Sequence, residues 1–159
     1  MSTLHSINGL KTFKFGDSAE LADRLAALVV AGVKTGTCSA AAHGVDVEVG
    51  ERQICLSGDD VPVCEIETVA LRILRFDEVT PEMAALEGEG DLSYRYWWEA
   101  HEAYFKRERT WKPDMDVVFE TFRMTCKLDD TFASRSNEMV KAERSEAFAN
   151  GYDALGAPQ

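Results

Sequence analysis

The run from Val61 to Phe76 constrains the fold most, because Val, Ile, Thr and Leu dominate it. This composition predicts one long bent strand or two consecutive strands. Pro62 lies near the start of the run, where a strand tolerates a proline. Helical patterns stand on both sides of the run, so the chain has to pack a β-sheet against helices.

Four helices are predicted from capping residues and apolar spacing. Asp17 as N-cap and Glu20 three residues later give the first helix a capping pattern, and Gly32 suits its C-terminal end. Thr80 followed by Pro81 marks the start of a second, short helix. The predicted helices cover residues 18–31, a short stretch after 80, 93–107 and 131–149. The last of them has four apolar inward candidates, Phe132, Met139, Val140 and Phe148.

Shorter strands are predicted over residues 33–38 and 117–124, with strand and turn segments over 44–58. The order of these elements does not repeat a βαβ unit, which argues against a doubly wound sheet. The expected class is α+β, with a small mixed sheet or barrel and helices on its outside. We expect a flexible lead-in over residues 1–12, one domain over 13–128, and a C-terminal helical extension and tail over 129–159.

The formal net charge of −11 limits the ligands that the surface can bind. Such a surface repels a polyanion, and nonspecific binding of long nucleic acid needs many phosphate contacts from Lys and Arg. Long nucleic acid is therefore not an expected partner. Any nucleic-acid role has to rest on a local basic patch or on a short ligand held in a pocket.

The four cysteines form no CxxC pair and no metal-finger spacing, which favours reduced thiols. The three histidines also lack metal-ligand spacing, and no glycine-rich phosphate loop occurs, so neither a metal nor a cofactor is expected. Neither a signal-peptide pattern nor an apolar run of membrane-spanning length is evident. We therefore expect a soluble cytoplasmic protein without a membrane partner.

Lys34 and Thr37 follow the first helix and form the first candidate site. Three residues apart on an ideal strand, they would face opposite sides, unless Gly36 supplies a bend or bulge. The lysine could activate a hydroxyl or hold a developing oxyanion. A surface lysine at the mouth of a turn is the alternative, because most lysines are solvated.

Three acids alternate with two glycines in the segment 87–91 and form the second candidate site. Close like charges raise one pKa, so this segment could supply a general acid or base. An exposed acidic loop is the alternative. The third candidate is the aromatic face of the helix over 93–107, which either stacks a base or packs as core.

Several blocks of the sequence resemble the ASCH domain family. The segments 15–18, 21–22, 28–29 and 31–40 resemble the opening of that domain. The segments 76–79 and 87–91, followed by Tyr96-Trp97, resemble later blocks of its longer bacterial branch. The resemblance covers roughly residues 13–125. It implies a PUA-like small β-barrel flanked by helices, with a cleft for RNA or nucleosides between barrel and helices.

Within this family, a short bacterial member is an acetylcytidine amidohydrolase that uses a lysine, a threonine and a glutamate. The resemblance matches these to Lys34, Thr37 and Glu89, with Glu87 as the fallback for the acid. This chain carries Cys38-Ser39 where that enzyme continues with an Ile-Arg pair. The longer branch is linked instead to ribonuclease-like activity.

Three functions are compatible with these residues. In an amidohydrolase, Lys34 would assist Thr37 in attacking the amide carbonyl of an N-acylated nucleoside, and Glu89 would shuttle the proton. In a metal-independent ribonuclease or RNA-binding module, a connected ring of Lys34 and strand arginines would hold phosphate. A non-catalytic sensor of a small ligand is the third. The expected ligand is thus a nucleoside or a short RNA.

Further contacts to the ligand are expected from residues near these segments. The predicted substrate-binding residues are Thr35, Glu87, Arg75, Trp97 and Arg123. The C-terminal helix either covers an edge strand or forms the contact of a homodimer.

Overall fold

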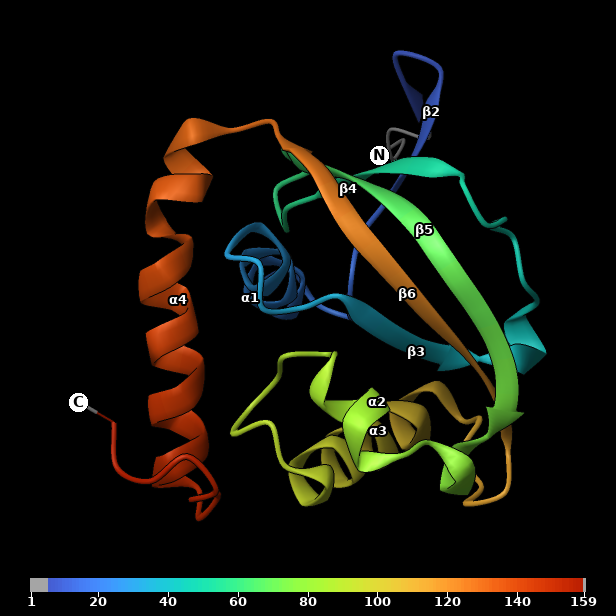
Figure 1. Cartoon of the computed structure of the whole chain (residues 1–159), viewed down its shortest axis with the longest axis vertical. Coiled ribbons are helices and arrows are strands. Elements are labelled where there is room, and N and C mark those ends of the chain that lie inside the picture. The colour runs from blue at the N-terminus through green and yellow to red at the C-terminus, as the bar shows by residue number, and fades with distance from the viewer. Residues whose placement is uncertain (1–5, 159) are drawn as a thin grey trace.

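The computed structural model describes residues 6–158, which form one sheet with helices around it. In Figure 1, α4 runs along one side of the molecule, α1 lies between α4 and the sheet, and α2 and α3 group beside β3. The strands are β1 (Ser6–Ile7), β2 (Leu10–Phe13), β3 (Gly36–Ala40), β4 (Arg52–Leu56), β5 (Pro62–Arg75) and β6 (Asp116–Lys127). The α-helices are α1 (Ala19–Val30), α2 (Pro81–Ala85), α3 (Tyr94–Glu108) and α4 (Asp130–Ala149). Short 3-10 turns occupy Ala41–His43 and Phe76–Glu78.

The six strands follow the order β1-β2-β4-β5-β6-β3, and only β2 and β4 pair in parallel. The predicted α+β class is therefore confirmed. Of the two expected alternatives, a small mixed sheet or a barrel, the structure has the mixed sheet, which is not closed because no pairing joins β1 or β2 to β3 within residues 6–158. β2 and β3 both contribute residues to one cavity.

The β-rich run forms one long strand, β5, in agreement with the first of the two alternatives for that region. β5 pairs with β4 over its first part and with β6 over nearly its whole length. The register with β6 shifts near Thr68, and such bulges bend a strand and increase its twist. β5 therefore curves around the core, as Figure 1 shows.

The predicted lead-in is wrong where the structure describes it. Residues 10–13 form β2, whose Thr12 pairs with Ile54 of β4. The Phe13 ring meets the Phe15 ring edge to face at 5.0 Å, which ties this strand to the core. Residues 1–5 of that prediction lie outside the described residues.

Two details of the helices also differ from expectation. Ser18, rather than Asp17, caps α1 by accepting the Leu21 N–H at 3.1 Å, and Asp17 forms an ion pair with Arg107. Phe148 is exposed, because the buried face of α4 is set by the helical period of other residues. That face consists of Phe132, Ser136, Met139, Val140, Glu143 and Ala147.

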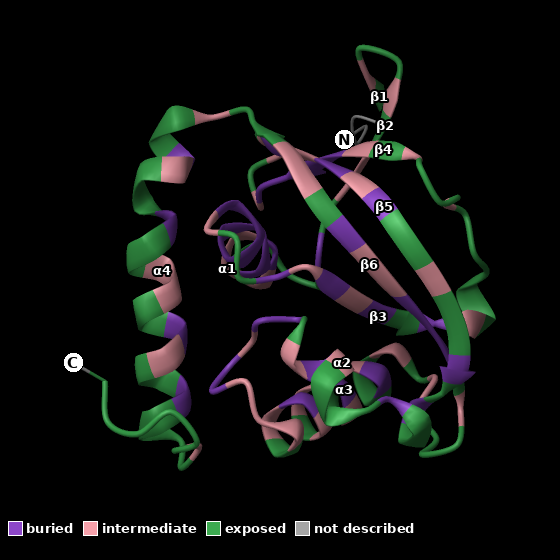
Figure 2. Cartoon of the chain, viewed as in Figure 1, coloured by how far each residue is buried: buried purple, intermediate pink, exposed green. Residues whose placement is uncertain are grey.

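Buried residues form two apolar clusters, and Figure 2 shows buried positions along α1 and at intervals along β5 and β6. One cluster joins α1, α4 and the strands β4 to β6. The other is aromatic and centres on Phe76, which stacks on Trp97 with ring centroids 4.8 Å apart. Most of the aromatic face of α3 is therefore core. No helix within residues 6–158 combines the length and apolarity that crossing a membrane requires.

We expect Phe76→Ala to lower the free energy of unfolding by about 3–5 kcal/mol, because it empties the centre of the aromatic cluster. Ile73 is the matched control, since it lies close by on β5 with 63% of its surface exposed. Ile73→Ala is expected to cost less than about 1 kcal/mol. Urea denaturation of both variants measures the difference, and similar losses would contradict this description of the core.

Candidate functional site

A cavity of 570 Å³ lies between β2, β3, α1, α3 and the loop after α2. The two strands that are not paired with each other contribute facing residues, with Phe13 on one side and Thr37 on the other. The predicted catalytic residues Lys34, Thr37 and Glu89 all line this cavity. The fold thus brings together three side chains from separate parts of the chain.

Lys34 is buried, with only 1% of its surface exposed, so the alternative of a surface lysine is wrong. The Leu28 carbonyl accepts the N–H groups of both Val33 and Lys34, which turns the chain back at the end of α1. Lys34 lies before β3 starts, so strand alternation does not separate it from Thr37. No bulge at Gly36 is needed.

The Lys34 ammonium donates to three oxygen atoms. They are the Gly36 carbonyl at 2.9 Å, Glu87 Oε1 at 3.1 Å and Glu89 Oε2 at 3.0 Å. Burial alone would lower the pKa of Lys34, but Glu89 and Glu87 outweigh it and raise the pKa above its usual value. Lys34 therefore stays protonated, and all of its donor hydrogens are engaged.

Glu87 is held on its other side by two donors from α3. Its Oε2 accepts the Trp97 indole N–H at 2.6 Å and lies 3.1 Å from His101 Nε2. Burial would raise the pKa of Glu87, but the charges of His101 and Lys34 bring it well below its usual range. Glu87 is thus a fixed anion.

Glu89 differs from Glu87 although both contact the same ammonium. Burial is the main cause of a raised pKa for Glu89, Lys34 opposes it, and the neighbouring Glu87 charge adds to it. A carboxyl with a raised pKa is better suited to exchange protons near neutral pH. Of the two acids, Glu89 is therefore the better suited to proton exchange.

Glycines shape the loop that carries both acids. Gly88 and Gly90 have positive φ angles of 71° and 60°. A Cβ atom on Gly88 would lie 2.4 Å from the Val33 carbonyl oxygen, and one on Gly90 would lie 2.3 Å from Cγ of Tyr96. Only glycine fits at these positions, so the alternation of acids and glycines reflects packing as well as backbone conformation.

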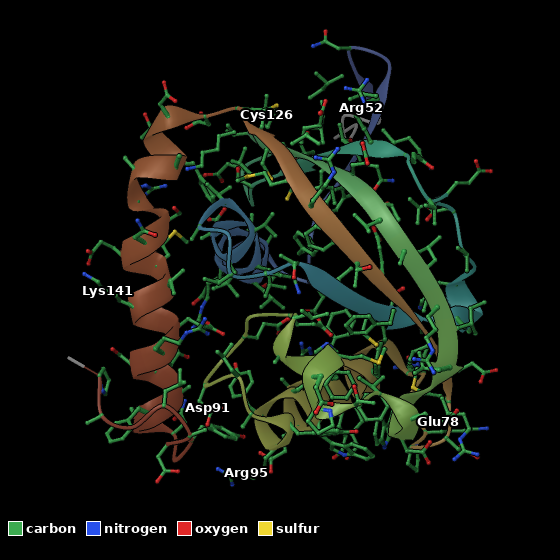
Figure 3. All side chains as sticks on the ribbon, in the orientation of Figure 1. Arg52, Glu78, Asp91, Arg95, Cys126 and Lys141 are labelled. Carbon is green, nitrogen blue, oxygen red and sulfur yellow. The ribbon has the colours of Figure 1, made fainter. Side chains whose placement is uncertain are left out.

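Four of the predicted substrate-binding residues do not line the cavity. Thr35 donates its backbone N–H to the Leu86 carbonyl, and Trp97 belongs to the aromatic core, where it orients Glu87. Arg75 pairs with acids of the turn after β5, and Figure 3 labels one of them, Glu78. Arg123 pairs with Glu67 on the exposed side of the sheet. The ring of cations expected for RNA does not form, because its arginines lie apart and Lys34 is buried.

His101 also belongs to the site, although it was not among the predicted site residues. Its spacing of four residues from Trp97 on one helix was the available signal. Glu87, Glu89 and His101 place possible ligand atoms within 4.8 Å of one another. The Lys34 ammonium, however, already bonds both carboxylates and supplies the positive charge that a metal ion would bring.

His101 gives the site a measurable pH dependence. Burial would lower its pKa, but Glu87 outweighs burial and raises the pKa above 6.5. At pH values between the pKa of His101 in the unfolded chain and its higher pKa in the folded protein, the folded state holds one more proton than the unfolded state. The contribution of His101 to stability therefore falls as the pH rises through this range.

We expect the stability difference between the native protein and His101→Gln to shrink from about pH 6 upward, by at most about 1.4 kcal/mol per pH unit. Unfolding curves recorded between about pH 6 and about pH 9 measure it. The control is His43→Gln, because His43 is exposed and pairs with Glu108 on the surface. If the free energy of unfolding changed with pH in the same way for the native protein and for His101→Gln, the description of this site would be contradicted.

Comparison with known proteins agrees with the fold. The ASCH domain family model matches residues 11–126. An ASCH domain crystal structure from Lactobacillus crispatus JV V101 is 31% identical with a TM-score of 0.67, over 71% of this chain and 77% of that one. A crystal structure of an Enterococcus faecalis V583 protein is 30% identical with a TM-score of 0.68, over 84% of this chain and 83% of that one. No curated protein matches. The chain therefore belongs to the ASCH domain family.

Proposed function

We propose that this protein binds a nucleoside in the cavity and hydrolyses an amide on its base, as in an N-acylated cytidine. The observation that carries the proposal is the convergence of Lys34, Thr37 and Glu89 on one cavity. Its volume of 570 Å³ is in the range of small-molecule sites. The resemblance to the acetylcytidine amidohydrolase of the family matches the same three residues.

The charges around the cavity favour an uncharged ligand. Every cation that lines it forms an ion pair in the part of the chain that the structure describes. These pairs are Lys11–Glu51, Lys14–Asp60, Arg24–Glu143, Lys34–Glu87 and Arg107–Asp17. A phosphate would have to compete with these carboxylates for the cations, whereas a nucleoside carries no phosphate.

Glu120 provides a contact that suits a nucleobase. It lines the cavity from β6, accepts the Thr68 hydroxyl at 2.8 Å, and has no ion-pair partner among residues 6–158. A carboxylate can accept further hydrogen bonds, so Glu120 can bind an N–H group on the edge of a base. Tyr96 and Tyr104 line the same cavity and offer aromatic surface to the ring.

In the proposed reaction, the Thr37 hydroxyl oxygen attacks the amide carbonyl carbon while its proton passes to the Glu89 carboxylate. The C–N bond then breaks, and Glu89 returns that proton to the leaving amine. Water attacks the resulting acyl-threonine ester and gives a proton to Glu89, which returns it to the Thr37 oxygen as the carboxylic acid leaves. The products are the free amine of the base and one carboxylic acid.

Lys34 has an indirect role in this scheme. Because it stays protonated and its hydrogens are engaged by three oxygens, it does not take the proton of Thr37. It orients Glu89 and keeps a positive charge beside the cavity, where negative charge develops on the carbonyl oxygen.

We expect the protein to release cytidine from N4-acetylcytidine, and Glu89→Gln and Thr37→Val to lower kcat by about 10²-fold or more. Both changes preserve side-chain shape but remove the proton acceptor or the nucleophile. Lys34→Met is a poorer probe, because it leaves two carboxylates buried without their cation. The control is Lys141→Met on the exposed side of α4, where the side chain is 70% exposed. Chromatography of the products measures turnover. Full activity of Glu89→Gln would contradict the proposal.

RNA binding is the second candidate, because a PUA-like fold of the ASCH family suggests it. If the cavity binds a nucleoside without phosphate contacts, affinity for a short single-stranded RNA should change less than about threefold between about 50 and about 200 mM salt. Fluorescence anisotropy with a labelled oligonucleotide measures this. A steep loss with salt, together with weaker binding by Arg123→Gln, would favour the RNA-binding alternative. A cytoplasmic location and a homodimer stay predictions.

A further inference from the structure

The C-terminal helix α4 contacts the loop over residues 87–91, called the acid loop below, through two consecutive residues. Arg144 Nη1 donates to the Gly88 carbonyl at 2.6 Å and to the Gly90 carbonyl at 2.7 Å. Glu143 Oε2 accepts the Gly90 N–H at 2.8 Å. These bonds hold the peptide groups on both sides of Glu89, so they determine where its carboxylate lies.

Glu143 also connects the loop to α1. Its second oxygen, Oε1, pairs with Arg24 at 2.6 Å, and both side chains line the cavity. Glu143 is buried on the face of α4 that also carries Phe132 and Ala147. A buried carboxylate whose two oxygens bond a cation and a loop N–H is held in one geometry. The link from α1 through α4 to the loop is therefore continuous.

A second group of contacts ties the end of α4 to the same region. Asp91 accepts the Ala154 N–H at 3.0 Å, and Arg95 donates to the Gly151 carbonyl at 2.9 Å. Figure 3 labels Asp91 and Arg95 beside the lower end of α4 and the turn that follows it. The polypeptide after residue 129 thus borders the acid loop at two places. α4 itself packs against α1 and does not cover an edge strand.

We propose that Glu143 and Arg144 are positioning residues, through which α4 places Glu89 against Lys34 and the cavity. The ASCH domain match ends at residue 126, so this support comes from outside the matched domain. The effect on turnover rests on the function proposed above, whereas the effect on the loop does not. Burial is the main cause of the raised Glu89 pKa, so a loosened loop should return this pKa toward its ordinary value.

The experiment compares Arg144→Met with Arg144→Lys, which keeps a positive donor. Two further variants are controls: Lys141→Met removes an exposed cation from α4, and Phe132→Ala weakens the packing of α4 without touching the loop. For each protein, NMR measures hydrogen exchange of the Gly90 amide and titration of the Glu89 side-chain carboxyl. Hydrolysis of N4-acetylcytidine is followed as a function of pH.

In Arg144→Met we expect the Gly90 amide to exchange at least about tenfold faster and the Glu89 pKa to fall. If Glu89 is the base, the acid limb of the kcat profile moves to lower pH, and kcat drops by about tenfold with KM nearly unchanged. Arg144→Lys should recover part of each effect. Phe132→Ala should lower the melting temperature without moving the acid limb or the Glu89 titration.

The proposal would be overturned if Arg144→Met had the same Gly90 exchange rate and the same Glu89 pKa as Lys141→Met. If Arg144→Met does not fold, the same comparison made with Arg144→Lys decides, because its single ammonium replaces a planar donor group. Absence of turnover in every protein, together with altered Gly90 exchange in Arg144→Met, would reject the hydrolase and keep the positioning role. Normal turnover together with unchanged Gly90 exchange in Arg144→Met would reject the positioning role and keep the hydrolase.

Discussion

The burial of the Lys34 ammonium is the constraint on which the rest of this site depends. Removing an ammonium from water costs several kcal/mol unless charge and hydrogen bonds replace the water. Here the replacement comes from one carbonyl and two carboxylates. Those carboxylates are themselves buried and need support, which Trp97 and His101 give to Glu87 and α4 gives to the backbone around Glu89. One buried charge therefore links α1, the acid loop, α3 and α4.

The same arrangement gives different properties to Glu87 and Glu89, two glutamates that lie two positions apart in the sequence. Glu87 has donors on both oxygens and is kept ionised, whereas Glu89 accepts from Lys34 alone among residues 6–158 and has a raised pKa. The sheet contributes to the site as well, because β2 and β3 do not pair with each other within residues 6–158 and both contribute residues to the cavity that Glu89 lines. The open sheet and the buried charge network together define where a ligand can lie.

Much of the fold could be predicted, because its signals are local. The long strand β5, the helices and their order follow from composition, spacing and capping patterns. The predictions that were wrong involved distant contacts. Residues 10–13 looked like a lead-in because their partner strand β4 lies 42 residues further on, as the pairing of Phe13 with Cys55 shows. Arg123 was predicted to contact the ligand because its partner on β5, Glu67, lies 56 residues away in the sequence. His101 carries no motif, and its place beside Glu87 depends on how α3 packs.

The sequence alone indicated the α+β class, the resemblance to the ASCH family and the segments that carry Lys34, Thr37 and Glu89. These follow from short-range patterns and from residue types in a given order. Only the tertiary structure decided that Lys34 is buried, that Glu87 and Glu89 share it, and that α4 holds the loop between them. Burial and pKa depend on atoms that come from distant segments and meet in space, and a one-dimensional pattern does not contain those distances.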